Sequence, residues 1–141
     1  MQQSDYILRE IEKISSMLLG IMGKMIRRKK EGIELNENEY SDMCVDLKAD
    51  SSLDIEEILQ IEKSEFNSYF VDKSGFNDKN IELIADLMIT MAEITFVDNI
   101  KLNLYQCALD IYHLLDESSK TFSIERIEKI NDVKNIINSI N

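Results

Sequence analysis

The chain has 141 residues, of which 44% are hydrophobic, and its formal net charge is −11. This length and apolar content suffice for one hydrophobic core, so a single domain over residues 1–141 is expected. The acidic excess argues against general binding to nucleic acid or to anionic membranes, since both depend on clustered Lys and Arg. The absence of proline, with only four glycines, predicts an all-α fold.

The first predicted helix runs from Asp5 to Glu31, with Ser4 as its N-cap. Gly32 is expected to end it in a left-handed conformation, followed by Ile33 as an apolar contact. Along the helix, apolar residues step by four and three positions and so form a heptad seam: Ile7, Ile11, Ile14, Leu18, Ile21 and Met25.

This seam is longer than one short partner helix can cover. Its N-terminal part is therefore predicted to remain available for another protein or for a second copy of the chain. The residues of this predicted interaction surface are Ile7, Ile11, Ile14 and Leu18.

The second half of the same helix combines an apolar run, Met17–Met25, with four cations, Arg27–Lys30. The run is interrupted by Lys24 and is about half of the ~20 residues that span a bilayer, so it is predicted to be core. The cations occupy the last helical turn, where each stabilises by ~0.3–1 kcal/mol; binding of phosphate or of a membrane surface is the alternative. Gly20 and Gly23 predict close approach of another helix.

Five further helices are predicted from apolar periodicity. Their expected ranges are Glu37–Ala49, Leu53–Asp72, Asp78–Phe96, Ile100–Glu117 and Ser123–Ile140. Ser51 or Ser52 is expected to open the helix over Leu53–Asp72. After it, the motif SGFND predicts Gly75 at the C′ position, Phe76 as its apolar contact and Asn77 as the next N-cap. The helix over Asp78–Phe96 is the most apolar and is predicted to be central.

Few residues could support catalysis. His113 is the only histidine, and on a helix Asp110 and Glu117 would lie within reach of its imidazole. A helix-surface histidine beside acids is ordinary, and no phosphate loop or nucleophile motif accompanies it, so no enzyme is expected. A carboxylate stripe in the second helix could attract a divalent cation but lacks the pattern of a calcium loop: Asp42, Asp46 and Asp50.

Cofactors and export are not expected either. Cys44 and Cys107 form no C-x-x-C pattern, so neither a zinc site nor a disulfide framework is predicted. The N-terminal stretch MQQSDYILREIEK is acidic where a secretory signal is basic and then apolar, which favours a cytoplasmic protein with reduced cysteines.

The segment ADLMITMAEITFVDNIKLNLYQCALDIYHLLDESS resembles a tetratricopeptide repeat, a pair of antiparallel helices. The best matches lie in its second helix, at Tyr105, Ala108, Leu109 and Ile111. Through DYILREIE at 5–12 and TFSIERIEKI at 121–130, the chain is also similar to an uncharacterised family of small all-helical bacterial proteins. These resemblances imply a helical array with a repeat-like hairpin and bring no site residues.

Two functions are therefore expected from the sequence. The first is a non-enzymatic, helical-repeat-like interaction or scaffold protein, without a cofactor, whose partner is another protein or its own copy. The alternative is a small-ligand sensor with a pocket between helices. The residues expected to line that pocket are Met88, Met91, Phe96 and Tyr105.

Overall fold

The computed structural model describes residues 2–71, 73–119 and 122–140. This part of the chain is all-α with a long N-terminal helix, as predicted, and contains no strand. Its elements are α1 (Gln2–Lys30), α2 (Glu37–Ser51), α3 (Ile55–Gln60), the 3₁₀ helix η1 (Lys63–Glu65), α4 (Phe66–Val71), α5 (Asp78–Ile94), α6 (Asp98–Ser118) and α7 (Ile124–Ile140). Two residues of the predicted loop before the last helix, Lys120 and Thr121, lie outside the described residues.

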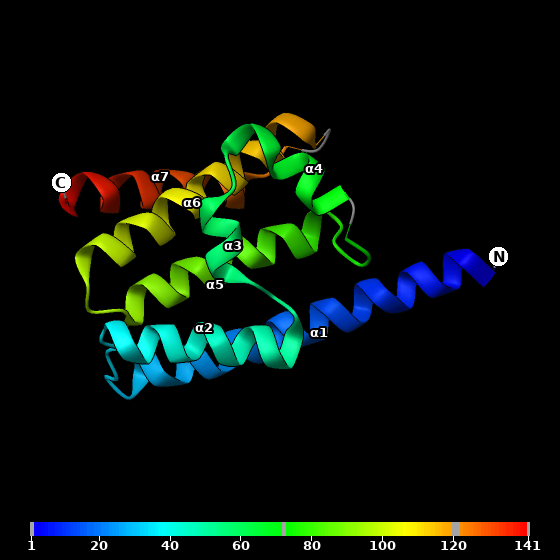
Figure 1. Cartoon of the computed structure of the whole chain (residues 1–141). Coiled ribbons are helices and arrows are strands. Elements are labelled where there is room, and N and C mark those ends of the chain that lie inside the picture. The colour runs from blue at the N-terminus through cyan, green and yellow to red at the C-terminus, as the bar shows by residue number, and fades with distance from the viewer. Residues whose placement is uncertain (1, 72, 120–121, 141) are drawn as a thin grey trace.

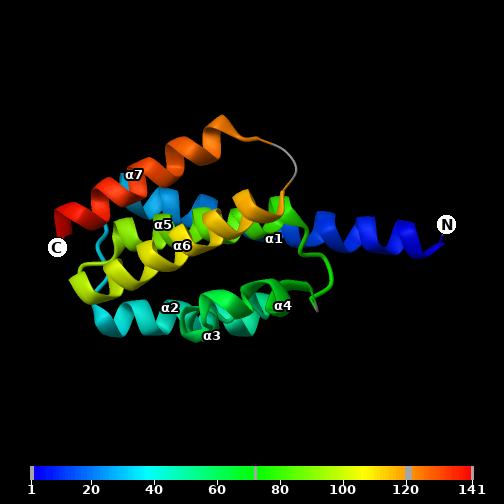
Figure 2. The same ribbon diagram turned by 90° about the horizontal axis from the view of Figure 1, so that it is seen from above.

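The helices are stacked in layers around α5 and α6. In Figures 1 and 2, α1, α5 and α6 lie next to one another in that order, and α5 runs parallel to α1 and antiparallel to α6. Seen from above, α2, α3 and α4 cover one side of this group, and α7 packs on the other side against α6 (Figure 2). The prediction that the most apolar helix is central is confirmed, because α5 packs against both α1 and α6.

The end of α1 forms as predicted, whereas its start does not. Gly32 has φ +73°, its N–H donates to Lys29 O at 3.1 Å, and Ile33 N–H donates to Arg28 O at 3.0 Å. This pair of bonds is a Schellman motif, which satisfies carbonyls that the helix end leaves free. At the other end, Ser4 lies inside α1 rather than at its N-cap, because the helix already begins at Gln2.

The prediction of one helix over Leu53–Asp72 is wrong. Ile61, with ψ 134°, ends α3, and η1 and α4 follow as separate pieces; Asp72 lies outside the described residues. The start also differs, because Asp54 is the N-cap and accepts from Glu57 N–H at 3.1 Å. Ser52, expected to open this helix, instead closes α2 with φ 61°. Both α3 and α4 pack on α6. The break between them lets each of the two helices contact α6 at its own angle.

Gly75 has φ +86°, but it is not the C′ residue of a helix, since α4 ends four positions earlier. Its role is close packing. A Cβ at this position would lie 2.8 Å from Glu10 O and 2.8 Å from Ile14 Cγ1 on α1. Asn77 caps α5 as predicted, accepting from Asn80 N–H at 3.0 Å.

The turn after α1 is tied to the turn between α5 and α6. Leu35 N–H donates to Ile94 O at 2.6 Å, and Phe96 N–H donates to Leu35 O at 2.8 Å. Lys29, in the last turn of α1, also forms an ion pair with Glu93 on α5. The C-terminal half of α1 is therefore fixed to the body of the molecule at its end.

Candidate functional site

The predicted interaction surface on α1 is only partly available. Ile7 is 50% exposed, whereas Ile11 and Ile14 are half-buried near the start of α5. Leu18 is fully buried in the core, so its assignment to the surface is wrong. The seam turns from exposed to buried along α1 because the rest of the molecule covers only its later turns.

The first turns of α1 extend past the other helices in both ribbon views (Figures 1 and 2). They carry three consecutive large apolar side chains, Tyr6, Ile7 and Leu8, which are 59%, 50% and 57% exposed. We call these three residues the projecting end. Three adjacent positions spread over some 200° of a helix, so this end is apolar around more than half of its circumference.

A buried amide marks the point where α1 leaves the body. The Nδ2 of Asn80, which is fully buried, donates to Ile11 O at 3.0 Å and to Gly75 O at 2.7 Å. Since Gly75 also lies directly against the backbone at Glu10, the helix is held firmly here. Sequence reasoning identified Gly75 but missed Asn80, whose polar side chain within an apolar helix was the available signal.

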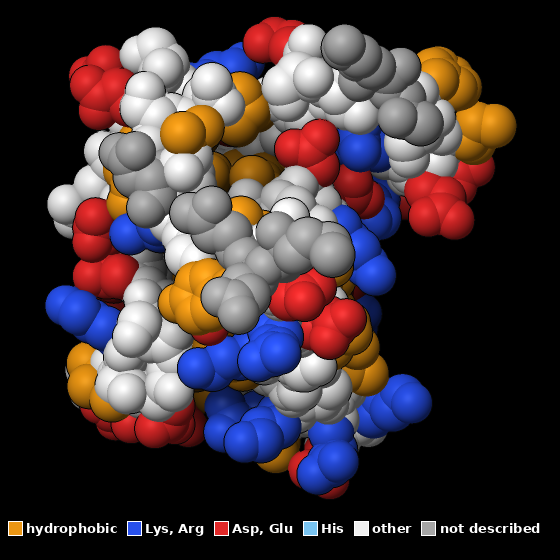
Figure 3. Space-filling model, turned by 90° about the vertical axis from the view of Figure 1, so that its right-hand side faces the viewer, with side chains coloured by type: hydrophobic (Ala, Val, Ile, Leu, Met, Phe, Trp, Pro, Cys, Tyr) orange, Lys and Arg blue, Asp and Glu red, His pale blue; other side chains and the backbone are white. Residues whose placement is uncertain are grey.

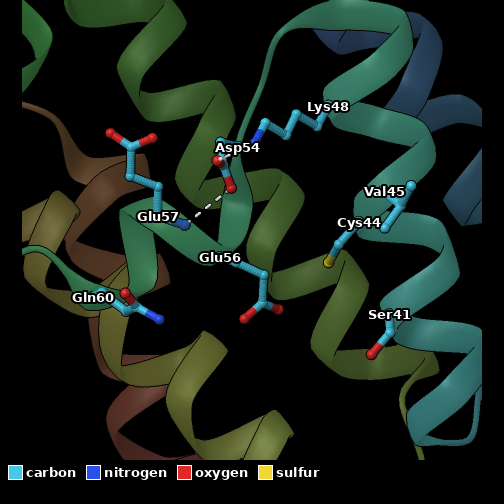
Figure 4. A pocket seen from close by; sticks show the side chains of 8 residues that line it. All are labelled: Ser41, Cys44, Val45, Lys48, Asp54, Glu56, Glu57 and Gln60. Carbon is cyan, nitrogen blue, oxygen red and sulfur yellow. Dashed lines mark hydrogen bonds and ion pairs between the residues drawn. The ribbon is translucent and has the colours of Figure 1, made fainter.

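A cavity of about 620 Å³ opens between α2 and α3 (Figure 4). Its lining residues are Ser41, Cys44, Val45, Lys48, Asp54, Glu56, Glu57 and Gln60. Figure 4 shows the side chains of Cys44 and Glu56 facing each other from the two helices. Lys48 Nζ lies 3.3 Å from Asp54 Oδ2, which leaves the carboxylates in excess around this cavity.

Cys44 is poorly suited to nucleophilic chemistry. Burial, reinforced by the charge of Glu56, raises the pKa of its thiol to about 12, so the thiol stays protonated at neutral pH. The thiolate is the reactive form, and reactive cysteines have lowered pKa values. The cavity therefore supports binding better than catalysis.

His113 is not part of an acid–base pair with the predicted neighbours. Among the described residues, no hydrogen bond or ion pair joins it to Asp110 or Glu117. Asp110 instead accepts from Nε2 of Gln106 at 3.2 Å, one turn earlier on α6.

The residues of the other predicted sites are also dispersed. Asp42, Asp46 and Asp50 are exposed on α2, and the described ranges contain no group of three or more His, Cys, Asp or Glu placed to hold a metal. The predicted ligand pocket is not assembled from its expected lining. Three of those residues are packed in the core and the fourth is 69% exposed: Met88, Met91, Tyr105 and Phe96.

An ion-pair network that sequence reasoning missed joins α7 to α5 and α6. Arg126, 7% exposed, donates from Nε to Glu82 Oε1 and from Nη1 to Asp116 Oδ1, both at 3.0 Å. Lys129 Nζ lies 2.8 Å from Glu82 Oε2 and 3.1 Å from Asp86 Oδ1. The available sequence signal was the i, i+3 spacing of the two cations on α7 and the i, i+4 spacing of the two acids on α5, because each spacing puts its pair on one face of a helix. The network holds α7 against α5 and α6, and its cations are paired with its carboxylates. We therefore assign the network a structural role.

The electrostatics of Glu82 follow from this network. Burial acts to raise the pKa of its carboxyl group, but hydrogen bonds from Lys129 and Arg126 outweigh burial and bring the pKa below 4.5. Burial acts to lower the pKa values of Arg126 and Lys129, but the neighbouring carboxylates outweigh it and raise both. Asp116 and Glu82 act on Arg126, and Glu82 and Asp86 act on Lys129.

Positive charge is concentrated on α1. This helix contains seven of the 16 Lys and Arg residues but only three of the 27 Asp and Glu residues. Figure 3, which views the molecule from the side of the projecting end, shows Lys and Arg gathered over its lower part, where α1 lies in Figure 1. Within the cluster Arg27–Lys30, Lys29 pairs with Glu93, and Arg28 Nη1 lies 3.7 Å from Met43 Sδ.

Within the described ranges, none of the helices combines the length and the hydropathy that a membrane span requires. Comparisons with protein-family models, with curated proteins and with solved structures found no match to this chain.

Proposed function

We propose that this chain is a non-enzymatic interaction or scaffold protein that binds another protein through the projecting end of α1. The observation that carries this proposal is the exposure of Tyr6, Ile7 and Leu8 on turns that extend beyond the body. A contiguous exposed apolar patch with charged neighbours is typical of a protein-binding site. An apolar helix of this kind binds by laying its side chains into a groove of the partner.

The anchoring of α1 supports the same function. Asn80 and Gly75 hold the helix one turn after the projecting end, so that end is presented in a fixed direction. Preorganisation lowers the entropy cost of binding. The antiparallel α5–α6 hairpin, whose sequence resembles a tetratricopeptide repeat, is the scaffold that carries it.

The non-enzymatic part of the proposal is supported by the chemistry of the candidate groups. Cys44 has a raised pKa, and His113 lacks a carboxylate partner at either predicted position. Nucleophilic catalysis needs an activated nucleophile with a base in reach.

The test is recovery of bound proteins from an extract of the source cells with immobilised chain. Ile7→Glu places a charge in the projecting end, and Ile124→Glu is the matched control because Ile124 is 65% exposed on α7. We expect a protein that binds wild type and Ile124→Glu but is lost with Ile7→Glu. Recovery of the same proteins by all three chains would refute the assignment of the site.

A small-ligand sensor is the second candidate, and the cavity between α2 and α3 favours it. Its volume of about 620 Å³ lies in the range of small-molecule pockets, and its excess of carboxylates suits a cationic ligand. A thermal-shift screen of organic cations tests it. A hit should raise the unfolding temperature of wild type and not of a Glu56→Gln, Glu57→Gln double variant.

A further inference from the structure

A second heptad pattern runs along the face of α1 that is turned away from the core. It lies five positions after the buried seam, about 140° around the helix, and we call it the outer face. Its residues are Glu12, Ser16, Leu19, Gly23, Ile26 and Lys30. All six are exposed, and Leu19 and Ile26 remain 52% and 41% exposed although both are large and apolar.

The close helix approach predicted at Gly20 and Gly23 does not occur within the described part of the chain. A Cβ at either position would meet nothing within 4 Å. Glycine in a helix interior weakens the helix relative to alanine, so neither glycine is explained by packing inside one molecule. On the outer face, Gly23 is flanked by Leu19 and Ile26, one turn away on each side.

We propose that two copies of this chain pair antiparallel through their outer faces. In this register Leu19 lies against Gly23 of the second copy, and Ser16 lies against its Ile26. Each layer then matches a large apolar side chain with a small residue. Such layers let two helices pack closely without leaving a void.

Charge complementarity selects the same orientation. The antiparallel register places Glu12 opposite Lys30 of the second copy at both ends of the contact, whereas a parallel pair would set Glu12 against Glu12 and Lys30 against Lys30. It also separates the two clusters Arg27–Lys30, which a parallel pair would bring together. Like charges facing each other across a helix pair are destabilising.

The contact involves residues 12–30, or about 27 Å of helix at 1.5 Å per residue. We estimate a buried area on the order of 1,000 Å², the low end for specific interfaces, and so expect micromolar association. The outer face does not include Ile7, and the proposal does not depend on the function of the projecting end. Ile7→Glu should leave the dimer intact, so failure of either proposal can be recognised separately.

Sedimentation velocity of the full chain, from low to high micromolar concentration, is the first test. We expect a dimer for wild type and a helical monomer for Leu19→Glu. Val45→Glu is the matched control, since Val45 is 65% exposed on α2, and it should remain dimeric. A wild-type chain that stays monomeric throughout would overturn the proposal, as would a dimeric Leu19→Glu.

Gly23→Leu separates pairing from helix stability. Leucine favours the helix over glycine and has open space in the monomer, so the unfolding temperature of the dilute chain should rise. The same side chain would occupy the place of Leu19 from the second copy, so the dissociation constant should increase at least about tenfold. An unchanged dissociation constant would contradict the pairing of Leu19 with Gly23.

Disulfide trapping tests the orientation. A mixture of Ser16→Cys and Ile26→Cys chains should form a cross-linked heterodimer on mild oxidation, whereas Ser16→Cys alone should not cross-link. Both native cysteines are buried and do not compete. Efficient cross-linking of Ser16→Cys alone would show a parallel pair. Monomeric wild type that sediments with phosphatidylglycerol vesicles would assign the outer face to a membrane surface instead; both results overturn the proposal.

Discussion

Asn80 on α5 donates a hydrogen bond from its Nδ2 to the main-chain oxygen of Ile11, 3.0 Å away on α1. The side chain is fully buried, and the same nitrogen also reaches Gly75 O. This contact divides α1 into two parts, a C-terminal part that belongs to the core and an N-terminal part that projects from it. The proposed binding function depends on this division.

Gly75→Ala should loosen the junction. An alanine there takes the cost of a left-handed conformation, ~1–2 kcal/mol, and in addition brings its Cβ against α1 at Glu10. Gly32→Ala is the matched control, because Gly32 has a similar φ but nothing within 4 Å. In urea denaturation, Gly75→Ala should lower the free energy of unfolding by at least ~1 kcal/mol more than Gly32→Ala. Equal losses would mean that Gly75 is not packed on α1.

Arg126→Met should destabilise the fold by about 2–4 kcal/mol, because Glu82 and Asp116 would lose a buried partner that satisfies them. Lys48→Met removes an exposed ion pair with Asp54 and should cost less than ~1 kcal/mol. Chemical denaturation of the two variants compares them directly. A similar small effect for both would show that the α7 network contributes little.

The lowered pKa of Glu82 predicts a pH dependence of stability. Since the folded chain keeps this carboxylate ionised where the unfolded chain would bind a proton, its ionisation stabilises the fold above about pH 4.5. This stabilisation is lost as the pH falls from about 4.5 through the lowered pKa. The free energy of unfolding of wild type should exceed that of Glu82→Gln at neutral pH, and the difference should shrink below pH 4.5. A constant difference down to the lowest accessible pH would contradict the assignment.

Leu87→Asp should unfold the domain. Leu87 is fully buried on α5, and an unpaired buried charge costs several kcal/mol against a typical total stability of ~5–15 kcal/mol. Val45→Asp, on the exposed side of α2, should change the free energy of unfolding by no more than ~0.5 kcal/mol. Circular dichroism melts distinguish them, and a wild-type melt for Leu87→Asp would show that α5 is not the centre of the core.

Local signals in the sequence predicted much of this fold because they act over a few residues. Gly32 ends α1 in the left-handed conformation that glycine favours, and Asn77 caps α5 with its side chain, as asparagine often does. The break at Ile61 had no such signal. The apolar positions of α3 and α4 fit one continuous helix, and periodicity reports which face is buried but not where the axis bends. The bend is set by packing on α6.

The candidate site was predictable only in part for a related reason. The seam indicated that α1 buries one stripe, but not how far the other helices extend along it, so Ile7 was placed on the surface correctly and Leu18 wrongly. That limit is fixed by Asn80 and Gly75, which reach α1 from some 70 positions away in sequence. Contacts of this separation leave no periodic pattern.

The most direct test of the account is site-specific photo-crosslinking from the projecting end. A photoreactive amino acid replaces Ile7 in one chain and Val45 in a control, and both are irradiated in the source cells. Since Val45 is at least as exposed but lies on α2, random collisions affect both chains alike. We expect a discrete protein adduct from position 7 that is absent from position 45. Adducts that are equal from both positions, or none from position 7, would contradict it.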